Sequence, residues 1–174
     1  MPHGTGDTDP RPGAELVEVI DDDGRVVSVV TRAEMRANRL RHRCVYLLVV
    51  GSDGRLLVHH RSPHKDLWPA RWDVAAGGVL AVDEPWDDAA RRELFEELGL
   101  VDVIIEPLGE GNFDDDDVHT VGRVYRVRSD GPFQFTDGEV TEARFVNADE
   151  LAELRAGAPF CPDSIAVALP LIGW

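Results

Sequence analysis

Three glutamates at helical spacing constrain the fold of this 174-residue chain more than any other feature. Glu93, Glu96 and Glu97 stand at positions i, i+3 and i+4, which places them within an arc of about 100° on a helix. Leu94 and Leu98 lie on the adjacent arc. This helix therefore needs a sheet to cover its apolar arc, and it sets three carboxylates in a row at the edge of the buried face.

The row of carboxylates has two interpretations. A lone ExxEE segment is most often the solvated face of a surface helix, because glutamate is a common helix former. Alternatively, three neighbouring carboxylates repel one another unless cations neutralise them, and oxygen-rich clusters of this kind are the ligands that Mg²⁺ or Mn²⁺ needs. Arg92 is the one cation placed to pair with the row.

The residues around the helix favour the second interpretation. Residues 78–100 read GVLAVDEPWDDAARRELFEELGL. This segment resembles the Nudix box: Gly, five residues, Glu, seven residues, then Arg-Glu-apolar-x-Glu-Glu-x-Gly-apolar. A chance match at one starting point has a probability on the order of 10⁻⁹. Every specified position is met, by Gly78, Glu84, Arg92, Glu93, Leu94, Glu96, Glu97, Gly99 and Leu100.

The rest of the chain predicts a mixed sheet between helices. Residues 16–20 and 26–30 form an N-terminal β-hairpin around an Asp-Asp-Gly turn, and residues 44–50 are the most apolar stretch, typical of a central strand. Further strands are expected at residues 55–60, 101–108, 118–128 and 141–146, and helices after Thr31, from Asp83 or Pro85 to Gly99, after Asn147 and over 163–171. Residues 61–76 read as irregular, with a break at Gly77-Gly78. The fold class is α/β, and the resemblance implies the Nudix α/β/α sandwich.

Length, charge and cysteine content exclude several classes of protein. The length fits one domain, so we expect a disordered tail over residues 1–13 and a single Nudix domain over residues 14–174. The formal charge of −15 argues against binding of a nucleic-acid polymer, which needs a basic surface. No apolar run is long enough to span a membrane, and the two cysteines form no zinc motif. The expected location is the cytoplasm; no oligomeric state is predicted.

The resemblance to the Nudix hydrolase superfamily implies an activity and a metal. Its enzymes cleave a pyrophosphate bond in a nucleoside diphosphate derivative by attack of water on phosphorus. Mg²⁺ or Mn²⁺ would be bound by Glu93, Glu96, Glu97 and the carbonyl of Gly77. Phosphoryl transfer needs such charge neutralisation. The resemblance assigns supporting roles to Gly78, Glu84, Arg92 and Gly99.

The identity of the general base is open between two glutamates. Glu93 lies inside the box, whereas Glu139 follows Asp137-Gly138 in a loop outside it. Either carboxylate could take the proton from water. The alternative for Glu139 is an ordinary turn carboxylate.

The flanks of the box resemble a branch related to isopentenyl-diphosphate isomerase. That enzyme carries a catalytic Cys just before the first Gly of the box and a metal-binding His soon after, but those positions hold Gly77 and Val79 here. Cys44 and Cys161 lie elsewhere, and we do not expect either to reach the site by local geometry. Because the box is intact, hydrolysis is favoured over two alternatives, an isomerase-like enzyme and a non-catalytic ligand-binding module.

The expected substrate is a small phosphorylated molecule. Nucleoside di- or triphosphates are the leading class, with a nucleoside monophosphate as product. Arg61, Lys65 and Arg71 are candidates to contact phosphates, and Trp72 is a candidate to stack on a base. Each of these charges could equally be a solvated surface group, and Trp72 could equally be a core residue.

Overall fold

The computed structural model describes residues 13–174. The strands are β1 (Leu16–Ile20), β2 (Val26–Thr31), β3 (His42–Val50), β4 (Leu56–Arg61), β5 (Trp72–Asp73), β6 (Ala76–Val79), β7 (Ile105–Asp114), β8 (His119–Arg128) and β9 (Val140–Val146). The helices are α1 (Arg32–Ala37), α2 (Trp86–Leu98), α3 (Ala148–Gly157), α4 (Pro162–Val167) and the 3₁₀ helix η1 (Leu169–Ile172). Apart from Gly13, the tail expected at residues 1–13 lies outside the described residues.

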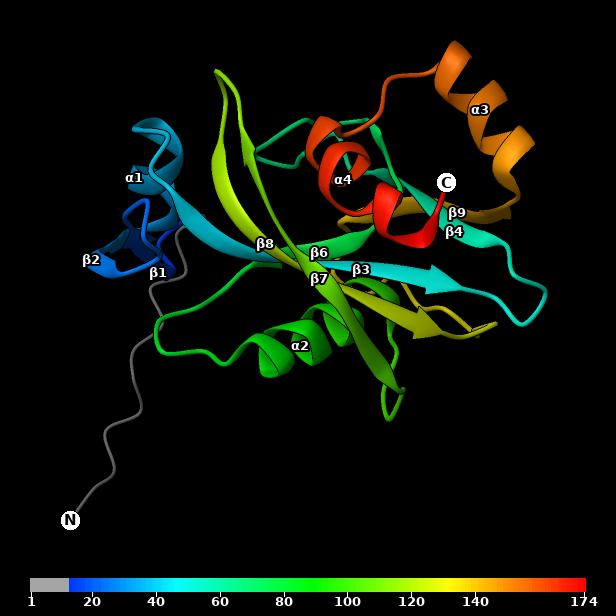
Figure 1. Ribbon diagram of the computed structural model, residues 1–174, viewed down its shortest axis with the longest axis horizontal. Helices are drawn as coiled ribbons and strands as arrows, with labels where there is room; N and C mark the ends of the chain where they lie inside the picture. Colours follow the sequence, from blue (N-terminus) through cyan, green and yellow to red (C-terminus); the bar gives the residue numbers. More distant parts are fainter. Residues whose placement is uncertain (1–12) are drawn as a thin grey trace.

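A mixed sheet is organised around β3, the apolar strand that the sequence predicts at its centre (Figure 1). β3 pairs in parallel with β8 over its whole length and antiparallel with β6. β4 joins the far end of β3, and β7 and β9 extend the sheet outward from β8 and β4. The expected mixed sheet is confirmed.

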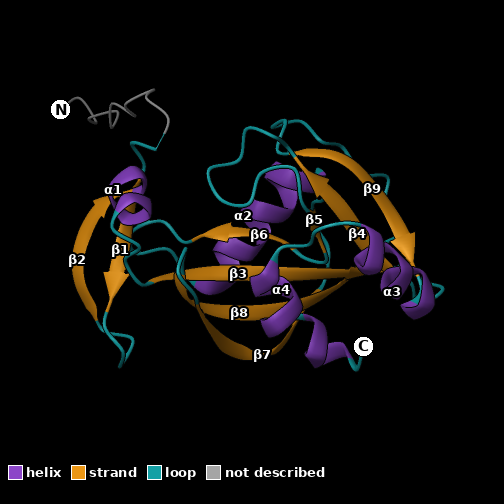
Figure 2. Ribbon diagram, turned by 90° about the horizontal axis from the view of Figure 1, so that it is seen from above, coloured by secondary structure: helices purple, strands orange, loops and turns teal. Residues whose placement is uncertain are grey.

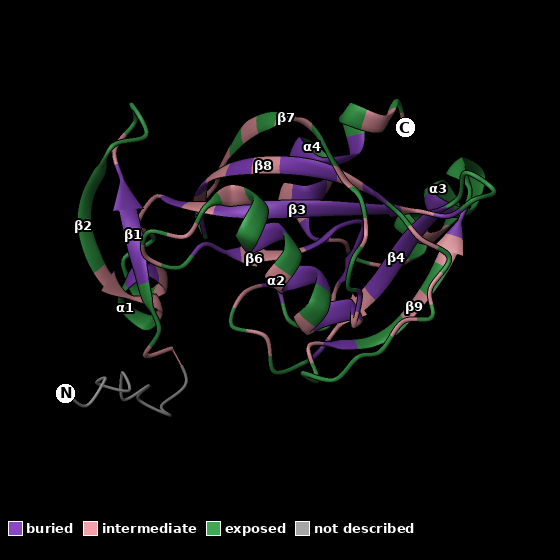
Figure 3. Cartoon of the chain, turned by 90° about the horizontal axis from the view of Figure 1, so that it is seen from below, coloured by how far each residue is buried: buried purple, intermediate pink, exposed green. Residues whose placement is uncertain are grey.

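Helices cover both faces of this sheet (Figure 2). β3 is buried on both sides, so that Val45 and Leu47 pack toward α2 while Tyr46 and Leu48 pack toward α3 and α4. This alternation follows from the two-residue period of a strand. Figure 3 shows α2 with buried residues on its sheet side and exposed residues on the other. The α/β/α sandwich is therefore confirmed.

The predicted N-terminal hairpin is present as a separate two-stranded sheet of β1 and β2. α1 follows directly, and the hydroxyl of Thr31 accepts a hydrogen bond from the Glu34 N–H, which caps the helix as expected. Met35 and Val17 attach this unit to Val79 of β6. In residues 13–174, no helix combines the length and the apolar character that crossing a membrane requires.

Two predicted boundaries are wrong. The Gly77-Gly78 pair does not break the chain but lies within β6, because a bare backbone there can approach β3. A Cβ at Gly77, whose φ is +155°, would stand 2.9 Å from the carbonyl carbon of Val45. The strand expected at residues 101–108 runs instead from Ile105 to Asp114, where pairing with β8 overrides the weak strand propensity of two glycines.

Candidate active site

α2 sets the predicted glutamates at the edge of the core. The helix begins after Pro85 and ends at Gly99, whose φ of +67° is the left-handed conformation that suits glycine. Leu94 is fully buried against the sheet. As a result Glu93 and Glu97 are drawn inward, with exposed fractions of 6% and 2%, whereas Glu96 stays partly exposed.

Arg92 brackets the acidic row by hydrogen bonds. Its Nη1 donates to Glu93 Oε1 at 2.6 Å and to Glu96 Oε2 at 3.1 Å. Its Nε and Nη2 donate to the two carboxylate oxygens of Glu84 at 2.7 and 2.9 Å, and Nη2 also donates to the carbonyl of Val79 at 3.1 Å. Arg92 therefore links Glu84 to the helix carboxylates in one hydrogen-bonded network.

Two glycines of β6 bring backbone close to these carboxylates. A Cβ at Gly78 would stand 2.6 Å from the carboxyl carbon of Glu93, so only glycine leaves room for this carboxylate. The N–H of Gly77 donates to Glu97 Oε2 at 3.2 Å. The β6 backbone and the inner face of α2 therefore form one continuous polar surface.

Lys65 joins this surface to a distant segment of the chain. Its ammonium group pairs with Glu139 and lies 3.7 Å from Glu97 Oε1. The Lys65 side chain is nearly buried, whereas the Glu139 side chain is 39% exposed. The structure thus brings Glu139, 42 positions after Glu97 in the chain, to the same site as the helix carboxylates.

Burial and charge shift the titration of these carboxylates in different directions. Burial raises the pKa of Glu97 well above its usual value, and the nearby Glu93 and Glu139 carboxylates add to this effect against the Lys65 ammonium. Burial also raises the pKa of Glu93, although Arg92 opposes the change. For Glu139, burial acts in the same sense, but the ion pair with Lys65 outweighs it and the net pKa is lowered. Of Glu93, Glu97 and Glu139, Glu139 is thus the most readily ionised.

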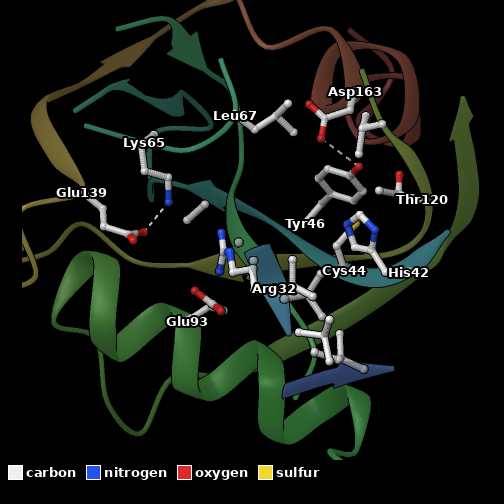
Figure 4. Close-up of a pocket in the computed structure, with 18 of the residues that line it drawn as sticks. Arg32, His42, Cys44, Tyr46, Lys65, Leu67, Glu93, Thr120, Glu139 and Asp163 are labelled. Carbon is white, nitrogen blue, oxygen red and sulfur yellow. Dashed lines mark hydrogen bonds and ion pairs between the residues drawn. The ribbon is translucent and has the colours of Figure 1, made fainter. Parts of the chain in front are cut away.

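A cavity of about 380 Å³ opens between α2, β6 and the segment after β4 (Figure 4). Of the predicted site residues, it is lined by Gly77, Gly78, Arg92, Glu93, Glu96, Glu139, Arg61 and Lys65. Glu97 lies directly behind the Gly77 backbone. Within residues 13–174, no three acidic, histidine or cysteine side chains are grouped as a metal site would require; the carboxylates are paired with Arg92 and Lys65 instead.

Arg61 plays a mainly structural role in the cavity wall. Its guanidinium donates to the carbonyls of Leu67 and Trp68 at 2.9 and 3.3 Å, and it lies 3.6 Å from Asp73. These contacts hold the irregular segment after β4 in place. Arg61 therefore supports the loop that carries Lys65.

Two of the predicted substrate contacts are not brought to the cavity. Trp72 is buried in the core, where its ring meets His60 edge-on and the Arg144 guanidinium lies over it. Arg71 donates to the carbonyl of Phe160 at 3.3 Å instead. Conversely, Cys44 does line the cavity, contrary to the expectation from local geometry. Burial raises the pKa of its thiol to about 12.

The far end of the cavity carries residues that the sequence analysis missed. Tyr46, Thr120 and Asp163 line it, with His42 beside them (Figure 4). A tyrosine within an otherwise aliphatic strand is a weak signal that could have been noticed. Asp163 comes from α4 and Thr120 from β8, so only the fold brings them together.

Comparisons with known proteins agree with this geometry. The family model described as "NUDIX domain" matches residues 40–165. An uncharacterized Nudix hydrolase of Pseudomonas aeruginosa, PA4841, is 36% identical over 87% of this chain and 90% of its own length. The uncharacterized Nudix hydrolase YfcD of Escherichia coli is 35% identical over 87% of this chain and 83% of its own length.

Among solved structures, DR0079 from Deinococcus radiodurans superimposes with a TM-score of 0.73 at 27% identity. The match covers 86% of this chain and 94% of DR0079. The family match spans most of the described fold and includes all of α2 and β6. The chain therefore belongs to the Nudix family and is a Nudix hydrolase, an enzyme class that cleaves pyrophosphate bonds and generally uses divalent cations.

Proposed function

We propose that this protein hydrolyses the pyrophosphate bond of a nucleoside di- or triphosphate in a reaction that depends on Mg²⁺ or Mn²⁺. One observation carries the proposal: glutamates of α2, the bare backbone of Gly77 and Gly78, and the Lys65–Glu139 pair meet at one cavity. Acidic groups at this density disfavour a polyanionic substrate by themselves. They become suitable when a cation stands between protein and phosphate.

The donor types at the site suit a hard divalent cation, but the α2 carboxylates now pair with Arg92 and Lys65 and would have to turn toward one point to hold it. Glu93, Glu96 and Glu97 offer carboxylate oxygens, the glycine at position 78 leaves the space that Glu93 uses, and the Gly77 carbonyl is the fourth oxygen donor that the resemblance implies. Burial is the main cause of the raised pKa of Glu93 and Glu97, repulsion by neighbouring carboxylates adds to it, and a bound cation would relieve that repulsion. Such an ion supplies charge neutralisation at the phosphate oxygens.

The other side chains have roles that follow from their contacts. Arg92 holds Glu93 and Glu96 in place by donating a hydrogen bond to each carboxylate. Lys65 presents a nearly buried ammonium group at the cavity, where it can pair with a phosphate oxygen. The ion pair with Lys65 outweighs burial and keeps the Glu139 carboxylate ionised at neutral pH, and its side chain is 39% exposed, so it can accept a proton from water. Glu93 remains the alternative base.

The substrate class has support from the cavity and from one structural neighbour. A volume of about 380 Å³ falls within the usual range for small-molecule sites. The NUDIX domain of Shewanella oneidensis NrtR, solved as a complex with ADP ribose, superimposes on this chain with a TM-score of 0.58 at 22% identity. A nucleotide derivative is therefore the first class to test.

A nucleotide panel assayed for phosphate and pyrophosphate release, with and without Mg²⁺ or Mn²⁺, tests the proposal. We expect turnover of at least one nucleoside di- or triphosphate that stops when the metal is chelated. Isopentenyl diphosphate belongs in the panel, because formation of dimethylallyl diphosphate would support the isomerase alternative. Binding without turnover of any compound would support a ligand-binding module instead.

A further inference from the structure

The end of the cavity away from α2 is a polar wall formed by Tyr46, Thr120 and Asp163. The Tyr46 hydroxyl donates to Asp163 Oδ2 at 3.0 Å, and the Ser164 N–H donates to Asp163 Oδ1 at 2.8 Å. Thr120 is only 3% exposed, and its hydroxyl lies near the Cys44 thiol and the Tyr46 hydroxyl but makes no hydrogen bond of good geometry among residues 13–174. An unpaired buried hydroxyl is costly, so its position in a cavity wall indicates a partner that is supplied by a ligand.

The backbone fixes these side chains in place. A Cβ at Gly122 would stand 2.7 Å from Cδ2 of the Tyr46 ring, so a glycine on β8 makes room for the ring. Thr120 lies opposite His42 in the parallel ladder of β3 and β8. Asp163 is held in the first turn of α4. The wall is therefore assembled from three separate elements, and Figure 4 shows the three side chains converging.

Counting donors and acceptors indicates which ligand the wall can take. Asp163 and Tyr46 keep unused acceptor lone pairs, and their donors are already committed. His42 adds no free donor, because Nδ1 lies 2.9 Å from the carbonyl of Leu40 and Nε2 faces the Arg36 guanidinium at 3.4 Å. Burial and the nearby Asp73 carboxylate raise the pKa of Asp163 to about 7, so above that pH its carboxylate is ionised and acts only as an acceptor. Among Tyr46, Thr120, Asp163 and His42, acceptors are therefore in excess and no free N–H donor is present.

We propose that Tyr46, Thr120 and Asp163 form a base-recognition subsite that selects nucleobases bearing an amino group. The proposal rests on the proposed function, because it assumes that the pyrophosphate of the same nucleotide lies at the α2 end of the cavity. An amino group would donate to the carboxylate of Asp163 and to the Thr120 or Tyr46 oxygen. A base with a carbonyl at that position would place two acceptors against each other.

Matched nucleotide pairs test this selection. CDP carries an amino group where UDP carries a carbonyl, and ADP differs from IDP in the same way. We expect the native protein to show a kcat/KM at least tenfold higher for the amino member of at least one pair. A site that hydrogen-bonds its substrate rejects the analogue that cannot pair, at least on this scale.

Asp163→Asn gives the sharpest variant. The Ser164 N–H should keep the amide oxygen in the place of Oδ1, so the amide nitrogen takes the place of Oδ2 and offers donors to the ligand. We therefore expect the preference to reverse toward UDP and IDP. Thr120→Val preserves shape and should reduce the preference without reversing it. Asp149→Asn, in the first turn of α3 and absent from the cavity lining, is the matched control and should leave the preference unchanged.

A second readout separates this proposal from the proposed function. Binding of CMP, UMP, AMP and IMP, measured by equilibrium dialysis, requires no pyrophosphate cleavage. Discrimination between these monophosphates that Asp163→Asn reverses supports the subsite even if the metal-dependent reaction is not observed. Equal binding and equal kcat/KM within both pairs, or no effect of Asp163→Asn and Thr120→Val in folded protein, would overturn the subsite and leave the hydrolase proposal intact.

Discussion

Replacing Gly78 by alanine should separate activity from stability. The added Cβ would stand 2.6 Å from the carboxyl carbon of Glu93, whereas two carbons in contact are separated by about 3.5 to 4.0 Å. The Glu93 carboxylate must therefore move by about 1 Å, away from its 2.6 Å hydrogen bond with Arg92. A displacement of this size in a catalytic group costs roughly a hundredfold in rate. We expect kcat/KM for the best nucleotide to fall by about that factor.

The same substitution should change the free energy of unfolding by less than about 1 kcal/mol. Gly78 has no positive φ, and the obstructing group is the end of a side chain, while alanine restricts the unfolded chain more than glycine does. Gly157→Ala is the matched control, because nothing lies within 4 Å of its Cβ, and it should keep full activity. Urea unfolding and steady-state kinetics on both variants measure the two effects. Full activity in Gly78→Ala would refute the placement of Glu93 at the reacting centre.

Three further changes have defined outcomes. Glu97→Gln should lower turnover at least a hundredfold, as expected for a metal ligand, and leave the metal-free Tm level or raised, because burial already favours the protonated carboxyl; a variant that unfolds would make Glu97 a structural partner instead. The double variant Cys44→Ala, Cys161→Ala should retain hydrolysis within about tenfold, since burial raises both thiol pKa values; isomerisation of isopentenyl diphosphate that either cysteine controls would contradict this. Burial lowers the pKa of His59 to about 4. The contribution of the neutral imidazole to the free energy of unfolding is therefore fully present above pH 6.5 and is lost as the pH falls toward 4. His59→Leu should therefore remove about 2 kcal/mol of the stability loss between pH 7 and pH 5 in urea titrations, and an unchanged loss would contradict burial of a neutral imidazole.

The fold and the α2 side of the site were largely predictable from local patterns. The spacing of Glu93, Glu96 and Glu97 is a property of one helix, and the apolar stretch that became β3 is continuous in sequence. Capping signals such as Asn147 with Glu150 are also local, and the structure confirms that capping box. These features depend on hydrogen bonds and periodicity within a few residues.

The remaining features depend on contacts between distant segments. Trp72 was a candidate to stack on a base, but β5 pairs with β4 and the Trp72 side chain is buried in the core. Tyr46 and Asp163 are 117 positions apart, and the strand at β6 exists only because Gly77 can approach β3. Cys44 and Cys161 form no disulfide. The cytoplasmic location expected from the sequence stays a prediction.

Hydrolysis in water enriched with ¹⁸O tests the central claim most directly. The protein is incubated with Mg²⁺ and the best nucleotide of the panel, and the ¹⁸O content of each product is measured by mass spectrometry. Attack of water on phosphorus predicts one ¹⁸O atom per turnover, found in a single product, with no reaction after chelation of the metal and very little with Glu97→Gln. If folded protein supplied with Mg²⁺ or Mn²⁺ transfers no ¹⁸O from water into a product of any nucleoside phosphate, nucleotide sugar or dinucleotide, the proposed activity is contradicted.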